Sequence, residues 1–195
     1  MNNFEAIENV PESLGYLKSV LSEFQNEVVV LEEGMGLFPN PEFGTDYYSI
    51  FLRRPPSKQG LDLVSGNIPD SYLRILRFYN GLKFFSLKLY GTYSHQERSD
   101  GHDLVTANTY WVGEYVGFDD GVMIGGGIAS FDESFGLFMY RNGSLKLFLK
   151  GQKKPSGIWE SLDSFFHEKH NELAKTEYDI HEELKKVRGI SAKGE

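Results

Sequence analysis

The chain has 195 residues, a length that suits one domain. A domain of this size can bury about 70% of its unfolded surface without the help of disulfide bonds or a structural metal. Its composition, 40% hydrophobic and 14% aromatic, indicates a packed core, and the lack of cysteine excludes disulfides and thiolate chemistry. The formal net charge of −8 disfavours nucleic-acid binding, because an acidic surface repels phosphates, and favours a basic protein partner, although the same acidity also promotes solubility.

The beginning of the chain carries no sign of export. Residues 1–6 lack the basic and apolar regions of a secretory signal. No apolar run approaches the ~20 residues that span a bilayer. We therefore expect a soluble, cytoplasmic protein without a membrane segment.

Three elements are predicted in the N-terminal third. Residues 12–25 predict an amphipathic helix, because leucines and a phenylalanine recur at three- and four-residue steps. Residues 28–31, which are β-branched and short, predict a buried strand, and residues 47–52 predict a second strand that ends before Pro55. Residues 57–67 are expected to form an exposed connection.

A short helix with both ends encoded follows. Pro69 suits the first turn, since its φ is preset and it has no N–H to lose, and Asp70 places a carboxylate near the unpaired amides. The pair Asn80–Gly81 supplies the left-handed residue with which helices commonly end. The apolar stripe of this helix consists of Tyr72, Leu73, Leu76 and Tyr79.

Apolar, aromatic-rich runs follow the helix, and several alternate with period two as half-buried strands do. The turn at 141–144 contains the Asn-Gly pair of a tight hairpin, and the polar residues 91–105 are expected to form a loop. The runs predicted as strands are 84–90, 109–112, 116–118, 122–127, 136–140 and 145–149.

The helical period returns at Ile158, where Trp159, Leu162, Phe166 and Leu173 share one face. Apolar spacing continues to Val187 and predicts a long or broken terminal helix. The order of elements predicts an α+β fold, a mostly antiparallel sheet of about 5–6 strands packed with N-terminal, central and C-terminal helices.

Two motifs could suggest a phosphate or metal site, but a structural explanation fits each of them better. The glycines at 125–127 lack the spacing and the following lysine of a phosphate loop, so we expect a flexible or bulged strand end. His167, Glu168 and His170 lie in one predicted helix, but zinc-binding helices place histidines four residues apart and here the spacing is three. Two solvent-facing histidines are expected instead.

The remaining polar clusters do not form a catalytic set either. His95 and His102, with Asp100 and Asp103, could bind a metal, yet a mobile polar loop is the commoner origin of such a cluster. No serine lies in a nucleophile elbow. The carboxylate pairs at 119–120 and 132–133 are adjacent in sequence, and neighbours on a strand point to opposite faces. We therefore predict that the protein is not an enzyme and needs no metal or cofactor.

The order of motifs resembles the SUKH superfamily, the Smi/Knr-type domains. Its members show an Ile/Leu-Pro-x-x-Tyr helix ending in Asn-Gly, an Ile-Gly strand start, a glycine-bearing hairpin and a closing helix with a Ser-Phe-x-x-Phe-type motif. The resemblance covers roughly residues 66–170, and the chain departs from it by an insertion around 37–66. The matching segments here are Ile68–Tyr72, Asn80–Gly81, Ile124–Gly125, Asn142–Gly143 and Ser161–Phe166.

The resemblance implies a single SUKH-like domain over residues 1–188, followed by a disordered tail at 189–195. Bacterial members of the family often act as immunity proteins, which block a cognate toxin, frequently a nuclease, in the cytoplasm. Fungal relatives suggest the alternative of a regulatory or scaffold domain without a toxin partner. From charge and predicted loop position, the candidate partner-binding residues are Asp100, Asp103, Asp119, Asp120, Asp132 and Glu133.

Overall fold

Nine strands form a single antiparallel sheet in the part of the chain that the structure describes. The structure is a computed structural model that describes residues 7–39, 48–92, 103–115, 120–130 and 132–187. Each strand pairs with the next one in sequence. The strands are β1 (Val29–Val30), β2 (Gly34–Pro39), β3 (Tyr48–Arg53), β4 (Leu82–Phe84), β5 (Leu87–Leu89), β6 (Val122–Ser130), β7 (Glu133–Met139), β8 (Leu145–Leu149) and β9 (Gly157–Trp159).

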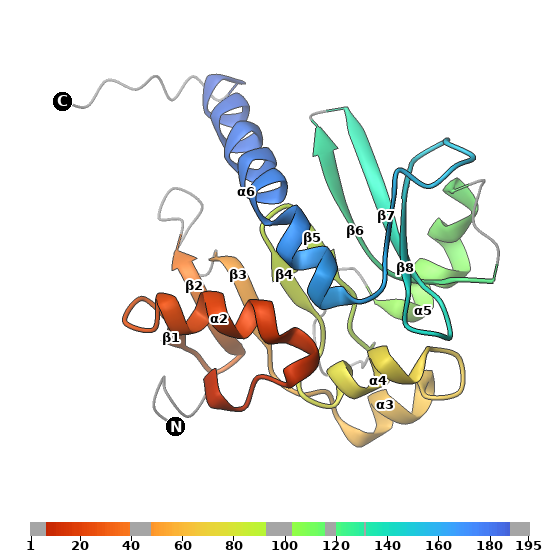
Figure 1. Cartoon of the computed structure of the whole chain (residues 1–195), viewed down its shortest axis with the longest axis horizontal. Coiled ribbons are helices and arrows are strands. Elements are labelled where there is room, and N and C mark those ends of the chain that lie inside the picture. Colours follow the sequence, from red (N-terminus) through yellow and green to blue (C-terminus); the bar gives the residue numbers. More distant parts are fainter. Residues whose placement is uncertain (1–6, 40–47, 93–102, 116–119, 131, 188–195) are drawn as a thin grey trace.

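Five α-helices accompany the sheet in the described residues, so the predicted α+β class and antiparallel pairing are confirmed. Figure 1 shows α2 in front of β1 to β3 and α6 running diagonally across the middle of the sheet. The helices are α2 (Gly15–Glu23), α3 (Lys58–Val64), α4 (Asp70–Leu76), α5 (Leu104–Thr106) and α6 (Leu162–Val187), with 3-10 turns at Glu12–Leu14 and Val112–Glu114 and a π-helical turn at Ala107–Trp111.

The prediction of about five or six strands was too low, because several strands are only two or three residues long. The run predicted as one strand at 84–90 is in fact a hairpin of β4 and β5. Phe85 turns the chain there with φ 54°, a conformation that bulky residues rarely adopt. Its ring lies 5.0 Å from the rings of both Phe84 and His170, and these contacts hold it in place. An apolar residue at the turn left no turn signal in the sequence.

Two local predictions were wrong for a common reason, which is helix capping. Residues 109–112, predicted as a strand, lie in the π-helical and 3-10 turns that continue α5, whose first amide groups are capped by Asp103. Residues 57–67, predicted as a connection, contain α3, because the Ser57 hydroxyl accepts a hydrogen bond from the Gly60 N–H at 3.1 Å. The predicted insertion at 37–66 also supplies β3, which pairs with both β2 and β4.

Helix α4 is anchored to the sheet through Tyr72, as the apolar stripe predicted. The Tyr72 side chain is fully buried, and its hydroxyl donates to the carbonyl oxygens of Tyr90 at 2.7 Å and Ile124 at 3.2 Å. Burial raises the pKa of Tyr72 above its ordinary value, so the phenol stays a neutral donor. The Asn80 side-chain oxygen Oδ1 then accepts from the Thr92 N–H at 2.6 Å, which links the end of the motif to the chain that follows β5.

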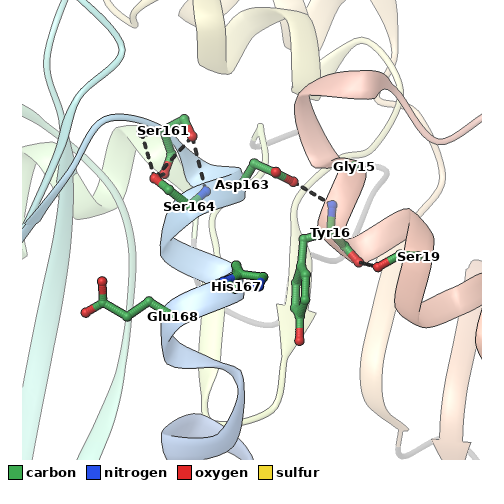
Figure 2. Close-up of a pocket in the computed structure, with 8 residues that line it drawn as sticks. All are labelled: Gly15, Tyr16, Ser19, Ser161, Asp163, Ser164, His167 and Glu168. Carbon is green, nitrogen blue, oxygen red and sulfur yellow. Dashed lines mark hydrogen bonds between the residues drawn. The ribbon is translucent and has the colours of Figure 1, made fainter.

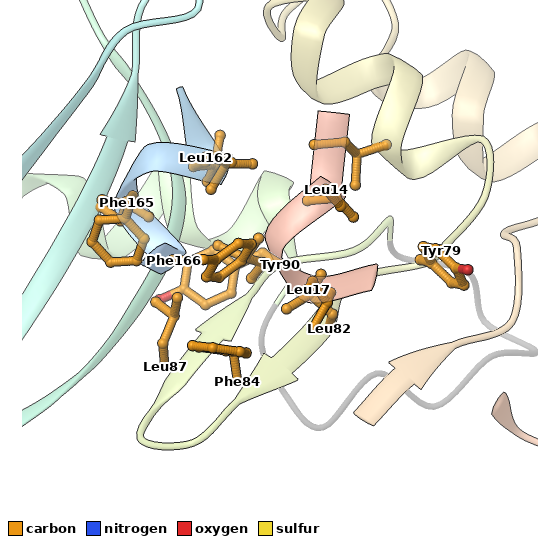
Figure 3. Close-up of a cluster of buried hydrophobic side chains, with 14 of the residues drawn as sticks. Leu14, Leu17, Tyr79, Leu82, Phe84, Leu87, Tyr90, Leu162, Phe165 and Phe166 are labelled. Atoms are coloured by element: carbon orange, nitrogen blue, oxygen red, sulfur yellow. The ribbon is translucent and has the colours of Figure 1, made fainter. Parts of the chain in front are cut away.

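The core lies where α2 and α6 meet β4 and β5 (Figure 3). The rings of Phe84 and Phe166 lie 4.6 Å apart, and both side chains are fully buried. The expected burial of Trp159, Leu162 and Phe166 is confirmed. The core side chains labelled in Figure 3 are Leu14, Leu17, Tyr79, Leu82, Phe84, Leu87, Tyr90, Leu162, Phe165 and Phe166.

A buried ion pair fixes the second half of α6. Lys83 on β4 donates to the Glu177 carboxylate and, at 2.9 Å, to the Tyr48 carbonyl oxygen. Their side chains are only 15% and 7% exposed. Burial lowers the pKa of Lys83, although the neighbouring Glu177 acts in the opposite direction. The pair therefore places α6 over one position of the sheet.

Truncation of Leu76 to alanine should destabilise the protein by about 2–5 kcal/mol, because this side chain is fully buried on α4. Leu63→Ala is the matched control, since Leu63 is 58% exposed on α3 and should change stability by less than about 0.5 kcal/mol. Urea unfolding of both variants measures the difference. Equal midpoints would contradict the assignment of Leu76 to the core.

Removal of the Glu177 charge should cost far more than removal of an exposed carboxylate on the same helix. Glu177→Gln leaves Lys83 buried without its counter-charge and should lower stability by about 3 kcal/mol. Glu172→Gln breaks a pair with Lys169 in which Glu172 is 64% exposed, and should cost less than about 1 kcal/mol. Similar losses in the two variants, measured by urea unfolding, would show that the buried pair does not hold α6.

Candidate functional site

The six acidic residues predicted to bind a partner do not form one cluster. Asp103 is only 4% exposed, and its two carboxylate oxygens accept from the Thr106 N–H at 2.9 Å and the Thr106 hydroxyl at 2.7 Å. It caps α5, so we leave it out of the proposed contact surface. Asp100 and Asp119 lie outside the described residues.

The other three carboxylates lie at two ends of one strand. Asp120 is exposed just before β6, while Asp132 is exposed and Glu133 half-exposed in the hairpin that joins β6 to β7. With nine residues in β6 and a rise of about 3.3 Å per residue, the two ends lie roughly 27 Å apart. A single small partner site can therefore include Asp132 and Glu133 or Asp120, but not all three.

A groove runs beside Glu133, between α6 and the outer half of the sheet; we call it the α6 groove. Its volume is about 240 Å³. Its floor is apolar and aromatic, and Glu133 and Glu172 carry its negative charges. Lys169 pairs with Glu172 at 2.5 Å and lies 5.8 Å from the centre of the Trp159 ring. The lining residues are Ile128, Ala129, Glu133, Phe135, Leu147, Leu149, Ser156, Trp159, Phe165, Lys169, Glu172, Leu173 and Thr176.

Trp159 gives this groove an unusual feature. The residue is 6% exposed, and its indole N–H is buried without a hydrogen-bond partner among the described residues. Its six-membered ring lies so close over Gly157 that a Cβ there would come within 2.1 Å of it. A buried donor without an acceptor costs free energy. The sequence predicted that Trp159 is buried, but it gave no sign that the indole N–H would have no acceptor among the described residues.

The glycines at 125–127 serve close packing. They lie inside β6, paired with both β5 and β7, and not at its end as expected, while the expected irregularity occurs between Met123 and Gly125. A Cβ on Gly127 would lie 2.4 Å from the Ser86 carbonyl oxygen, and one on Gly126 would lie 2.6 Å from the Tyr90 hydroxyl. Only glycine fits between these neighbours, so the motif is explained without a bound phosphate.

A second, open hollow lies between the starts of α2 and α6 (Figure 2). The polar side chains of this hollow form hydrogen bonds with backbone groups at the starts of the two helices. The Asp163 carboxylate accepts from the Tyr16 N–H at 2.6 Å, at the first turn of α2. The Ser161 hydroxyl accepts from the Ser164 N–H at 3.1 Å, and the Ser164 hydroxyl donates back to the Ser161 carbonyl oxygen at 2.9 Å. These side chains fix the starts of the two helices.

The two histidines of α6 differ in environment, although both were expected to face solvent. His167 is exposed, with its ring edge-on to Tyr16 at 5.0 Å. His170 is half-buried, shares a 3.1 Å hydrogen bond between its Nδ1 and the Tyr16 hydroxyl, and packs edge-on against Phe84 at 5.5 Å. His170 is therefore part of the contact between α2 and α6.

Neither a metal centre nor a spanning helix is found in the described part of the chain. No three His, Asp or Glu side chains come close enough there to hold a metal ion. Of the predicted loop cluster, His95, Asp100 and His102 lie outside the described residues. No described helix has the length and apolar character that a bilayer crossing requires.

Comparison with known protein families, with curated proteins and with solved structures finds no match to this chain.

Acid should weaken the α2–α6 contact through His170. Burial lowers the pKa of His170 below its ordinary value of 6.5, although Glu23 acts in the opposite direction. The unfolded chain then binds this proton more readily than the folded one, so stability falls as the pH drops below about 6.5. His170→Asn should reduce the loss of stability between pH 7.5 and pH 5.5 in urea unfolding.

The control is His167→Asn, which removes an exposed histidine three residues away. It should keep the pH dependence of the wild type. An undiminished loss of stability in His170→Asn would show that protonation of other groups causes it.

Proposed function

We propose that this chain is a non-catalytic protein-binding domain that acts as an immunity protein. It would neutralise a basic toxin domain, most simply a nuclease, in the cytoplasm of a bacterium engaged in contact-dependent competition. Two sequence features support the proposal: the motif order that resembles SUKH domains, and the net charge of −8. A nuclease must itself be basic to hold its substrate, and this makes it complementary in charge.

The observation that carries the proposal is the combination of charge and apolar surface at the α6 groove. Asp132 and Glu133 lie at one end of it and Glu172 on its helix wall, around an aromatic floor. Opposite charges speed the encounter of two proteins, while a few buried anchors supply most of the affinity. Trp159 and Phe135 are already buried and form part of the apolar lining, so the anchors would be side chains of the partner that enter the groove.

Inhibition by such a domain requires no chemistry. A toxin whose basic site is covered by the acidic rim of the groove cannot bind nucleic acid. The groove is lined by strands β6 to β9 and by α6, and Glu177 already fixes that helix. Binding at the groove would therefore order few groups of this chain, which keeps the entropic cost of association low.

Charge reversal at the groove should abolish protection, whereas the same change elsewhere should not. In cells that express a candidate toxin encoded beside this gene, Asp132→Lys/Glu133→Lys should lower survival relative to wild type. Asp62→Lys/Asp120→Lys changes the net charge equally, at exposed positions on α3 and before β6, and should protect normally. Exposed carboxylates contribute little to stability, so both variants should unfold at wild-type urea concentrations.

Kinetics with the purified pair provide the second readout. Raising the salt concentration should slow association more than it speeds dissociation, because charges steer only within a Debye length of ~8 Å at physiological ionic strength. If the variant at 62 and 120 loses protection instead, the contact surface lies away from the α6 groove. If the wild type itself protects against no neighbouring toxin, the regulatory or scaffold role of Smi/Knr-type domains becomes the better proposal.

A further inference from the structure

A hollow of about 440 Å³ at the other end of the sheet combines arginines with an apolar floor. It lies where the ends of β1, β2 and β3 meet the end of α4, and we call it the arginine hollow. Strands β4 and β5 separate it from the part of the sheet that forms the α6 groove. Its lining residues are Asn9, Val30, Leu31, Gly34, Met35, Leu52, Arg53, Arg54, Pro55, Arg77, Phe78 and Tyr79.

Positive charge is concentrated here in a chain that is otherwise acidic. Three of the five described arginines line the hollow, the others being Arg74 and Arg141, and its lining contains no carboxylate. Arg54 and Arg77 are exposed, and within the described residues neither side chain forms an ion pair. Like charges brought together repel, so an anion bound between them would be favoured.

The walls of the hollow are held by backbone hydrogen bonds. The Arg54 N–H donates to the Glu33 carbonyl oxygen at 2.9 Å, and the Arg54 carbonyl accepts from the Asn80 N–H at 3.0 Å. Gly34 brings β2 so close to β3 that a Cβ on it would lie 2.1 Å from the Leu52 carbonyl oxygen. The hollow is therefore preformed, which lowers the entropic cost of binding.

The floor of the hollow is apolar and its far side carries a phenol. Met35 and Leu52 are 5% and 0% exposed, and Phe78, at 44% exposed, forms an open apolar wall. Figure 3 shows the Tyr79 ring at the border of the core, with its hydroxyl directed away from Leu82. Burial raises the pKa of Tyr79 to about 12, so this hydroxyl remains a donor at neutral pH.

We propose that the arginine hollow binds a small amphipathic carboxylate, with the carboxylate on Arg54 and Arg77 and the apolar body over Met35 and Leu52. Guanidinium groups match the planar geometry of a carboxylate, which they bind through two parallel hydrogen bonds. The volume falls in the range of small-molecule sites, about 300–1,000 Å³, and a protein face would need a larger surface. This site is independent of the proposed immunity function, since it shares no lining residue with the α6 groove.

The first test compares octanoate with octylammonium, which have the same apolar chain and opposite charge. Octanoate should bind the intact protein at one site in calorimetry, at least tenfold more tightly than octylammonium. In an NMR spectrum of the protein with labelled methionine methyl groups, octanoate should shift the Met35 signal. The signals of Met123 and Met139, which are buried outside the hollow, should stay unchanged. Equal binding of the two amphiphiles, or an unmoved Met35 signal, would overturn the proposal.

Variants then assign the binding to the arginines. Arg54→Gln/Arg77→Gln should weaken octanoate binding at least tenfold, while Lys153→Gln/Lys154→Gln, an equal loss of charge in an exposed turn, should not. Saturating octanoate should raise the unfolding temperature of the wild type and the lysine variant but not of the arginine variant. Unchanged octanoate affinity in a folded arginine variant would contradict the site.

The carboxylate could belong to a free acid or to the carboxyl terminus of a protein, and a peptide pair distinguishes these sources. Acetyl-Gly-Leu-Phe with a free carboxylate is compared with its amide for displacement of octanoate. Displacement by the free acid alone supports the site and identifies a protein terminus as the source. A lack of displacement by both supports the site with a free acid as ligand, while equal displacement by both contradicts recognition through a carboxylate.

Discussion

A long sheet of short antiparallel strands needs its apolar face covered, and α6 crosses the middle of that face (Figure 1). The contact of Phe166 with Phe84 places the first half of the helix over the β4–β5 hairpin. The pair of Glu177 with Lys83 fixes the second half over the same hairpin. A helix held at these two points still contacts β6, where the Thr176 hydroxyl donates to the Ala129 carbonyl oxygen at 3.5 Å, but it leaves a space beside β7 and β8. The α6 groove is the space that this geometry leaves open.

The two candidate sites have opposite charge and lie on different parts of the same sheet. Carboxylates at the β6–β7 hairpin flank the α6 groove, while arginines surround the hollow near β1 to β3. A charge distribution of this kind orients an approaching protein, because a basic partner is drawn toward one end and repelled from the other. The net charge of the chain alone does not reveal this separation.

Much of the fold could be predicted from local sequence signals. The motif helix α4 with Tyr72 buried and the Asn-Gly turn before β8 follow from periodicity and turn residues. Trp159 is buried as expected, but it lies on β9 and not on the closing helix, which begins at Leu162. The β4–β5 hairpin could not be predicted, since a phenylalanine occupies its turn and is held by contacts with residues distant in sequence. Short strands were missed because two or three residues cannot display a period.

The candidate sites were harder to predict than the fold, since they depend on which distant elements meet. Asp132 and Glu133 were identified from charge, but Glu172 and Trp159, which face the same groove, come from α6 and β9. The arginine hollow joins Arg54, at the end of β3, to Arg77, at the end of α4, across more than twenty residues of sequence. No spacing rule connects these positions, because it is the pairing of β3 with β4 that brings them together.

Helix capping explains why several chemically suggestive residues are not functional here. Asp103, Asp163 and Ser161 each accept a hydrogen bond from an amide in the first turn of a helix. A carboxylate or hydroxyl engaged in this way is oriented along the helix axis, and binding a partner with it would expose the amide that it satisfies. Such a residue therefore contributes to stability and is a poor contact residue. Asp132 is different: it lies in an exposed turn between two strands, where it can bind a partner while the β6–β7 pairing stays intact. Distance from the start of a helix is thus a physical criterion that separates the two kinds of carboxylate in this chain.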